Sequence, residues 1–276
     1  MPELPEVEAT RRHLEPVLVG ETIETAEVRR PRMVRRQERP GDFAARLTGR
    51  RVESLGRRGK FLLASVEGDI TWVTHLGMSG RISVAEPGTP EPAHTNVVVR
   101  LRRGPEIRLI DPRTFGFVAA FTPSELAGQP AARLGPDALA ELPDPTMLAQ
   151  GMARRSIPIK ALLLDQRFVA GIGNIYADEI LFRAGVAPHR PADELQPAEV
   201  GRVHAAVTPV LRDGLRHGGT SLDDLAYLLP DDRAGAYLER LSVYGRDGQP
   251  CPVCGTEIAR AVVRQRSAHW CPSCQR

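Results

Sequence analysis

The four cysteines of this sequence lie in two close pairs near its end. Cys251 and Cys254 are separated by two residues, Cys271 and Cys274 repeat that spacing, and sixteen residues lie between the pairs. Each pair can present two thiolates from one tight turn, and two such turns at the ends of a β-hairpin complete a tetrahedral zinc shell. Four thiolates leave no position for water, so the spacing predicts one structural Zn2+ per chain. Disulfides are the alternative, which a reducing cytosol would disfavour, and His269 would be a ligand only if one cysteine lay outside the shell.

Lysine is rare in this chain, because 35 of its 37 basic side chains are arginine and only Lys60 and Lys160 remain. A compact ammonium on a slim stem fits where a planar guanidinium does not, so each lysine is a candidate for a specific contact. Codon bias with two chance survivors is the alternative explanation. Asn96 and Asn174 are likewise the only asparagines.

Arginines cluster at residues 29–36 and 50–60, and the stretch 246–276 holds five arginines against two acidic residues. Such patches can neutralise DNA phosphates and release counterions. Solvated faces without a partner are the alternative. The net charge of +3 is too small to establish a nucleic-acid partner by itself.

The composition indicates a folded chain without membrane attachment. With 276 residues, 42% of them hydrophobic, the chain can bury a sizeable core and divide into domains. No apolar run approaches the roughly 18 residues that a membrane helix needs. The acidic start MPELPEVE also lacks the basic and apolar regions of a signal peptide. We therefore expect a cytoplasmic protein. We also expect it to act as a monomer.

Seven short segments resemble motifs of the formamidopyrimidine-DNA glycosylase family, and they occur in the family's order. They are MPELPEVE, RRGKF, HLGMSG, DPRTFG, GIGNIYADE, GGTS and, before the cysteine pairs, VYGR. Each could be accidental, but together they are specific. The resemblance implies a bifunctional DNA repair glycosylase that excises oxidised purines (8-oxoguanine and formamidopyrimidines) from duplex DNA. The resemblance also implies that the enzyme then cleaves the resulting abasic site by β,δ-elimination.

The resemblance assigns the chemistry to the N-terminus. Removal of Met1 would free the secondary amine of Pro2, an α-amine with an unperturbed pKa of about 8. This amine would attack the sugar C1′ and form an iminium of Schiff-base type. Glu3 is expected to act as general acid or base near the sugar ring oxygen, with Glu6 as a supporting carboxylate. A generic helix start would also place acidic residues here.

The other residues that the resemblance carries over are expected to contact DNA. A lesion must leave the base stack before it can be cut, so a wedge must fill the gap. The family's wedge corresponds to Met78, Arg113 and Phe115, with core packing as the alternative for the two apolar residues. Lys60 and Arg266 are expected to bind phosphate and are assigned to the catalytic residues. Arg266 lies at the expected tip of the zinc hairpin. The remaining DNA contacts fall on His75, His94, Lys160, Asn174 and Tyr244.

Hydrophobic periodicity indicates the elements that must position these residues. An amphipathic helix is expected from about Pro5 to Leu18, with Gly20 as its stop. Short β-branched segments then predict a two-layer β-sandwich over residues 22–121, with strands at 61–66, 70–75, 96–101 and 107–110. Prolines mark a linker near 122–134. Helices are expected at 158–164, 175–184, 197–215 and 221–228.

The fold class is therefore predicted as α+β, with an N-terminal helix and β-sandwich. With the resemblance, the domains are a catalytic β-sandwich domain (1–130), a helical helix-two-turn-helix domain that binds double-stranded DNA (131–245) and a zinc-finger hairpin (246–276).

This chain departs from the family at a few places. Thr114 stands where many members have a second arginine, and the acidic segment 221–240 does not closely follow the family's lesion-recognition loop. One alternative is an endonuclease VIII-like glycosylase for oxidised pyrimidines, which the start ELPEVE rather than EGPE disfavours. The other is a non-catalytic lesion-binding zinc-ribbon protein, which would be expected to lose Pro2 or Glu3.

Overall fold

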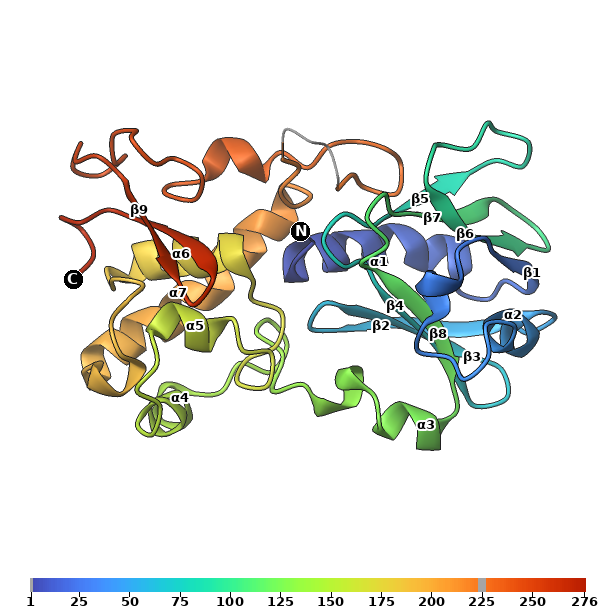
Figure 1. Ribbon diagram of the computed structural model, residues 1–276, viewed down its shortest axis with the longest axis horizontal. Coiled ribbons are helices and arrows are strands. Elements are labelled where there is room, and N and C mark those ends of the chain that lie inside the picture. The colour runs from blue at the N-terminus through green and yellow to red at the C-terminus, as the bar shows by residue number, and fades with distance from the viewer. Residues whose placement is uncertain (1, 223–226) are drawn as a thin grey trace. The chain divides into compact units, whose positions relative to one another are not determined.

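The computed structural model describes residues 2–222 and 227–276, which form two compact units (Figure 1). The first unit comprises Met1–Arg133 and Leu215–Leu238, and the second comprises Leu134–Gly214 and Glu239–Arg276. This grouping differs from the predicted domain boundaries in placing residues 215–238 with the N-terminal part of the chain. The division into 1–130, 131–245 and 246–276 stays a proposal about the family's domains.

Two antiparallel four-stranded sheets form the body of the first unit (Figure 1). One sheet has the order β1-β6-β7-β5 and the other β2-β3-β4-β8. The strands are β1 (Ile23–Val28), β2 (Val52–Arg58), β3 (Phe61–Val66), β4 (Ile70–His75), β5 (Arg81–Ala85), β6 (Thr95–Leu101), β7 (Glu106–Ile110) and β8 (Phe117–Phe121). Apolar side chains from both sheets join one core, which confirms the predicted sandwich.

Helix α1 (Leu4–Leu18) closes this core at one side. Pro5 suits its first turn because a fixed φ and a missing N–H are tolerated there. Gly20 follows its end with a φ of +89°, as the sequence predicted for a helix stop. The short elements η1 (Pro31–Val34) and α2 (Asp42–Leu47) bury Met33 and Phe43 in the same core.

The predicted linker near 122–134 is partly helical. It contains α3 (Pro123–Ala127) and η2 (Pro130–Arg133). Thr122 and Glu125 form a capping box, in which each side chain accepts a hydrogen bond from the other residue's backbone N–H. The prolines that indicated a linker therefore begin helical turns here, since proline is tolerated at a first helical position.

The second unit is helical and ends in a β-hairpin. Its elements are α4 (Pro145–Met152), α5 (Ile159–Leu163), α6 (Asn174–Ala184), η3 (Ala192–Glu194), α7 (Pro197–Arg216), η4 (Tyr237–Arg240), β9 (Ala259–Val263) and β10 (Arg266–Trp270). The last two residues of α7 and the first two of η4 belong to the first unit. Tyr176 of α6 is fully buried, and a Cβ at Gly214 would lie 2.5 Å from its hydroxyl. Glycine thus lets α7 pack closely on α6.

The helix predicted at 221–228 centres on residues 223–226, which lie outside the described residues. The described residues on either side of this gap, 221–222 and 227–228, are not helical. Among the residues that the structure describes, no helix is long and apolar enough to cross a membrane.

Candidate active site and DNA interface

The N-terminal residues assigned to catalysis are buried at the start of α1. Pro2 is buried and Glu3 is fully so, whereas Met1 lies outside the described residues. The Glu6 carboxylate accepts hydrogen bonds from the backbone N–H groups of Glu3 and Thr220, both at 2.8 Å. A Cβ at Gly219 would lie only 2.7 Å from the Glu6 side chain. Glu6 thus ties the start of α1 to the GGTS segment, within the first unit.

Hydrogen bonds hold several residues of the divergent acidic segment 221–240 in place. The Ser221 hydroxyl donates to the Tyr227 carbonyl (2.7 Å) and accepts from the Gly235 N–H (2.8 Å). The Tyr227 hydroxyl donates to the Glu6 carbonyl (3.1 Å). Ser221, Tyr227 and Gly235 of this segment are therefore held together, and Tyr227 is bound to the start of α1, although the segment's sequence differs from the family's loop.

Lys60 and His75 lie at the ends of adjacent strands of one sheet. Lys60 is buried in the turn between β2 and β3, and His75 ends β4. Burial, followed by the charges of Lys60, Arg35 and Arg36, lowers the pKa of His75 to about 4. Its Nδ1 accepts the Gly77 N–H at 3.0 Å. His75 is therefore neutral at pH 7 and can act as a neutral donor through Nε2, not as a cation.

The three predicted wedge residues lie on two loops that contact each other. Met78 follows β4, and Arg113 and Phe115 precede β8. The Arg113 guanidinium lies 4.6 Å from the centroid of the Phe115 ring, and Phe115 is 40% exposed. An exposed aromatic side chain stacked on an arginine is not a core residue, so the structure favours the wedge interpretation of Phe115 over core packing.

Gly77 marks the point of contact between these loops. Its φ is +65°, and a Cβ there would lie 2.4 Å from the Gly116 nitrogen and 2.5 Å from the Phe115 carbonyl carbon. Backbone atoms cannot move away as a flexible side chain can. Glycine is therefore required twice here, for its conformation and for its size.

We expect Gly77→Ala to lower the free energy of unfolding by about 2 kcal/mol or more. Gly88→Ala is the matched control, because Gly88 has a similar φ of +82° but a Cβ there would meet nothing within 4 Å. It should lose only about 1 kcal/mol, the conformational part. Urea unfolding of both variants measures the difference, and equal losses would contradict the close contact at Gly77.

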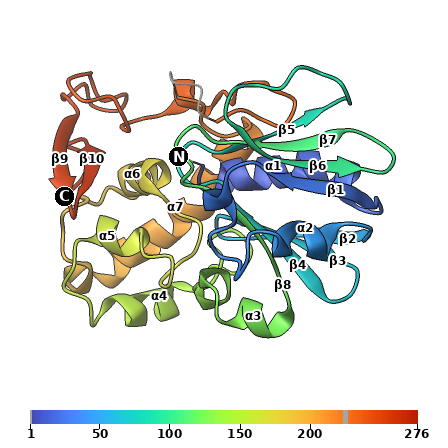
Figure 2. The same cartoon turned by 45° about the vertical axis from the view of Figure 1, so that its right-hand side comes forward.

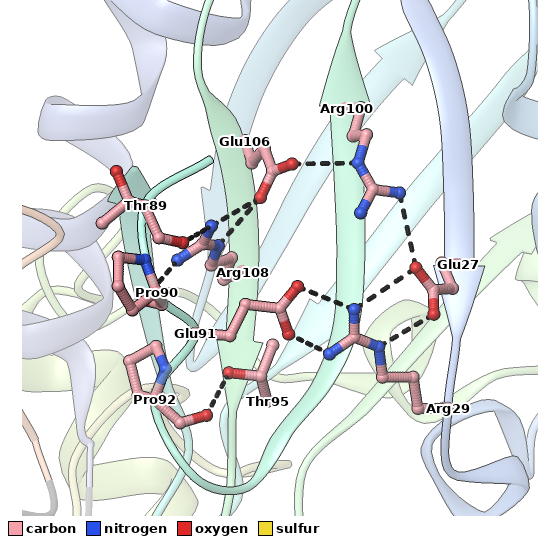
Figure 3. Close-up of polar contacts among 10 residues, drawn as sticks. All are labelled: Glu27, Arg29, Thr89, Pro90, Glu91, Pro92, Thr95, Arg100, Glu106 and Arg108. Carbon is pink, nitrogen blue, oxygen red and sulfur yellow. Dashed lines mark hydrogen bonds and ion pairs between the residues drawn. The ribbon is translucent and has the colours of Figure 1, made fainter. Parts of the chain in front are cut away.

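His94 ends the loop that connects β5 to β6, and the sheet holds that loop in place. Buried Arg108 pairs with Glu106 (2.7 Å) and donates to two carbonyls of the loop, at 2.8 and 3.2 Å (Figure 3). His94 is exposed with a φ of +64°, and its carbonyl accepts the Asp111 N–H (3.1 Å). The predicted DNA-binding His94 therefore stands directly beside the loop of Arg113.

Arginines from both of the N-terminal clusters are paired within the protein. Arg29 donates to Glu27 (2.9 Å) and Glu91 (2.8 Å) on the outer face of one sheet (Figure 3). In the second cluster, Arg57 is bound to Glu8 of α1 at 3.1 Å. For these residues the structure favours internal pairing over the phosphate-neutralising patches that the clustering suggested.

Asn174 and the hairpin tip come together in the second unit. Asn174 is the first residue of α6, and its Nδ2 donates to the Ser267 hydroxyl (3.2 Å), next to Arg266. Arg264 and Gln265 form the two-residue turn with φ of +46° and +67°, as in type I′ hairpins. A helix N-terminus beside the exposed Arg266 is suited to hold a phosphate.

Lys160 is fully buried rather than exposed on a DNA-facing surface. Its Nζ donates to Asp178 (2.6 Å) and to the Ser267 carbonyl. Asp178 also accepts the His269 N–H at 2.9 Å. Lys160 and Asp178 therefore support the hairpin strand that carries Arg266, and direct contact between Lys160 and DNA stays a prediction.

The buried carboxylates of α6 were missed by sequence reasoning, although both lie in the segment GIGNIYADE. Glu179 accepts the backbone N–H groups of Ser242, Val243 and Tyr244, at 2.9 to 3.0 Å. Burial raises the pKa of Glu179, against the effect of these three hydrogen bonds. Two adjacent acidic residues within an apolar helix were the available signal. Glu179 fixes the backbone of Tyr244, a predicted DNA-binding residue.

The four cysteine sulfurs all lie within 4.8 Å of one another. Cys251 and Cys274 are 3.9 Å apart and Cys254 and Cys271 are 3.4 Å apart, sulfur to sulfur. A tetrahedral zinc with Zn–S bonds of about 2.3 Å implies sulfur separations of about 3.8 Å. Both ring nitrogens of His269 face carboxylates instead. The residues therefore fit a closed four-cysteine zinc site without His269.

Comparison with known proteins matches the chain almost end to end. Residues 1–118 match the formamidopyrimidine-DNA glycosylase N-terminal domain, residues 134–225 its H2TH domain, and residues 248–276 a zinc finger found in FPG and IleRS. A formamidopyrimidine-DNA glycosylase of Geobacillus kaustophilus is 43% identical, with 100% of each chain covered. The chain belongs to the formamidopyrimidine-DNA glycosylase family. This confirms the predicted resemblance, the α+β fold class and the structural zinc.

Solved structures of family members have the same fold. The MutM (Fpg) protein of Thermus thermophilus has a TM-score of 0.89 at 41% identity, with 99% of this chain and 98% of that chain covered. The Lactococcus lactis Fpg in complex with DNA containing an abasic site has a TM-score of 0.90 at 30% identity, with 99% of each chain covered. A point mutant of the same Lactococcus lactis protein, bound to DNA containing Fapy-dG, has a TM-score of 0.91 at 30% identity, with each chain fully covered.

The zinc finger of this family member should support DNA binding without taking part in the chemistry. We expect Cys251→Ser to release zinc and, because the hairpin then loses its closed shell, to lower DNA affinity by about tenfold or more. Arg266→Ala should keep one zinc per chain but reduce the slope of log affinity against log salt by about one. Metal analysis and fluorescence anisotropy measure both. Active protein without zinc would contradict the structural role.

Proposed function

We propose that this chain is a bifunctional DNA glycosylase and abasic-site lyase of base excision repair, acting on oxidised purines in duplex DNA. The observation that carries the proposal is the pair Pro2 and Glu3, buried at the start of α1 and fixed there through Glu6. Relatives of the same family support it, among them the Lactococcus lactis protein bound to abasic-site DNA. The enzyme would act as a monomer in the cytoplasm.

The chemistry begins at the N-terminal amine. After removal of Met1, the lone pair of the uncharged Pro2 amine attacks C1′, and the bond from C1′ to the damaged base breaks with its electrons leaving on the base. The proton that the Pro2 nitrogen loses balances the proton that the departing base takes up. Glu3 protonates the sugar ring oxygen as the ring opens, which leaves an iminium on Pro2. Loss of the C2′ proton then expels the 3′ phosphate, and a second elimination expels the 5′ phosphate. Hydrolysis of the iminium releases the enzyme.

The other residues hold the DNA for this reaction. In our proposal Lys60 contacts phosphate as a cation and His75 as a neutral donor, because its lowered pKa leaves it uncharged. Asn174 and Arg266 grip phosphate from the second unit, with zinc holding the hairpin. Met78, Arg113 and Phe115 fill the space that the extruded nucleotide leaves.

The base preference is tested by single-turnover excision from duplexes that differ only in the lesion. We expect 8-oxoguanine opposite cytosine to be excised at least roughly tenfold faster than thymine glycol. Arg113 should also favour cytosine as the partner, since a guanidinium donates to its acceptor edge. Arg113→Ala should then lose about tenfold of the preference for cytosine over adenine, while cleavage at abasic sites survives.

The same experiment separates the proposed function from its alternatives. Faster excision of thymine glycol would indicate an endonuclease VIII-like enzyme and would direct attention to the divergent segment 221–240. Binding to both lesions without excision of either would indicate a lesion-binding protein.

A further inference from the structure

The loop of the wedge residues, 111–116, is held in a strained conformation. Thr114 has a φ of +52°, in the left-handed region that β-branched residues rarely adopt. A short loop relaxes from such a state unless its surroundings fix it. Arg113 and Phe115, the two wedge side chains of this loop, are exposed. Core packing of these side chains therefore does not hold the loop in place, and other contacts must do so.

Asp111 accepts hydrogen bonds from two backbone N–H groups of this loop. It is fully buried, and its carboxylate accepts the backbone N–H groups of Arg113 (3.2 Å) and Gly116 (2.7 Å). The same carboxylate accepts the Ser79 hydroxyl (2.7 Å), from the turn that carries Met78. Asp111 thus fixes the loop at both ends and joins it to the second loop of the wedge.

Arg35 donates hydrogen bonds to two backbone carbonyl groups of the same loop. One guanidinium nitrogen donates to the Phe115 carbonyl (2.9 Å) and another to the Gly116 carbonyl (2.6 Å). Partial burial, followed by the charges of Arg32 and Arg36, lowers the pKa of Arg35. The guanidinium is thus held in an unfavourable setting for a cation, and its two carbonyl bonds offset that cost.

We propose that Asp111 and Arg35 are positioning residues that form the wedge loop before DNA binds. A loop that is already ordered loses little conformational freedom when Phe115 and Arg113 enter the base stack, so insertion is faster. This inference rests on the proposed function of the wedge. It assigns to Arg35 a role that its place in an arginine cluster does not suggest, since clustering indicates only a phosphate-binding patch or a solvated face.

Wedge insertion can be followed on a duplex with a tetrahydrofuran abasic analogue and 2-aminopurine next to the unpaired base of the other strand. Insertion unstacks 2-aminopurine and raises its fluorescence. We expect Asp111→Asn to slow this rise by roughly tenfold. The asparagine NH2 group replaces one acceptor oxygen, so a donor would face a donor and a hydrogen bond to the loop would be lost. The buried Asp111 cannot contact DNA itself.

Chemistry at Pro2 provides the internal control. A single-stranded oligonucleotide with an abasic site has no partner base and no opposite stack, so its cleavage should not depend on the wedge. We expect Asp111→Asn to cleave it at the wild-type rate while excising 8-oxoguanine from duplex DNA roughly tenfold more slowly. Equal slowing on both substrates would indicate general damage to the fold and would overturn the positioning role.

Arg35→Lys decides the matter if Asp111→Asn does not fold, since Arg35 is exposed enough for its substitution to be tolerated. Lysine keeps the charge but cannot reproduce a two-nitrogen grip. We expect slower insertion with an unchanged salt slope of binding, whereas the matched Arg36→Lys should leave insertion unchanged. Normal insertion by Arg35→Lys would overturn the proposal. So would a salt slope reduced by about one in Arg35→Met, which would mark a phosphate contact instead.

Failure of this inference is distinguishable from failure of the proposed function. If the wild-type protein excises 8-oxoguanine but the variants insert the wedge normally, only the positioning role is wrong. If the wild-type protein excises no lesion, the proposed function itself fails.

Discussion

Borohydride trapping on abasic-site DNA is expected to fall to background when the N-terminal amine is blocked. A retained Met1 converts the Pro2 nitrogen into a tertiary amide, whose lone pair is delocalised and which cannot form an iminium. Free Pro2 offers a secondary amine whose iminium borohydride reduces to a stable linkage. Denaturing electrophoresis of the reduced mixture measures the covalent fraction, with the processed protein as reference.

Two controls show whether loss of trapping comes from the nucleophile. Pro2→Gly, processed to a free terminus, has a primary amine and should trap weakly rather than not at all. The blocked protein should still bind the abasic analogue with near-normal affinity, because the phosphate contacts of Lys60 and Asn174 do not involve Pro2. Undiminished trapping with a blocked terminus would refute the assignment of Pro2.

The second large effect is expected at the buried ion pair of the second unit. Asp178→Ala should lower the free energy of unfolding of that unit by about 3–5 kcal/mol, because it leaves a buried ammonium without its carboxylate. Both side chains of the Lys160–Asp178 pair are fully buried, and their charged atoms are 2.6 Å apart. Asp178 also accepts the backbone N–H of His269, so the hairpin would lose a hydrogen bond as well.

The measurement needs a signal from the second unit alone. The chain has two tryptophans, Trp72 in the sandwich and Trp270 in the hairpin, so a Trp72→Phe background makes Trp270 the only reporter. Asp165→Ala is the matched surface control, since its pair with Arg155 is exposed and 4.0 Å long, and it should cost less than about 1 kcal/mol. Equal effects of the two substitutions would contradict the supporting role of the buried pair.

Local sequence signals predicted most of the fold. The strands at 61–66 and 70–75 were correct, those expected to begin at 96 and 107 begin one residue earlier, and the helices expected at 175 and 197 were located within one or two residues. These elements have regular alternation or helical periodicity, which depends only on neighbouring residues. The zinc site was predicted for the same reason, because its ligand spacing is short and its chemistry is restrictive.

Long-range pairings could not be predicted in this way. Arg35 and Phe115 are eighty positions apart, and no local pattern indicates that the guanidinium of one grips the carbonyl of the other. The same holds for Arg29 and Glu91 in a network that joins three segments (Figure 3). Clustering alone therefore leaves phosphate-binding patches and solvated faces as the two interpretations of these arginines, whereas several of them stabilise the protein's own loops.

The interior position of Lys160 shows a related limit. Its rarity and its match to a family position indicated a functional lysine, and both observations are equally consistent with a structural one. Burial separates these possibilities, and burial is a property of the folded chain. Strand β10 of the hairpin lies beside α6 (Figure 2). Lys160 therefore contacts both Asp178 and Ser267, although the three residues come from different elements.

The most direct test of the proposed chemistry is to locate the covalent bond formed with DNA. The processed protein is trapped on abasic-site DNA with borohydride and digested, and the peptide that carries the reduced sugar is identified by mass spectrometry. The chain has few candidate amines, because Lys60 and Lys160 are its only lysines. We predict an adduct on the nitrogen of Pro2 and unmodified peptides for both lysines. An adduct on Lys60 or Lys160, with Pro2 unmodified, would contradict the assignment of Pro2 as the nucleophile.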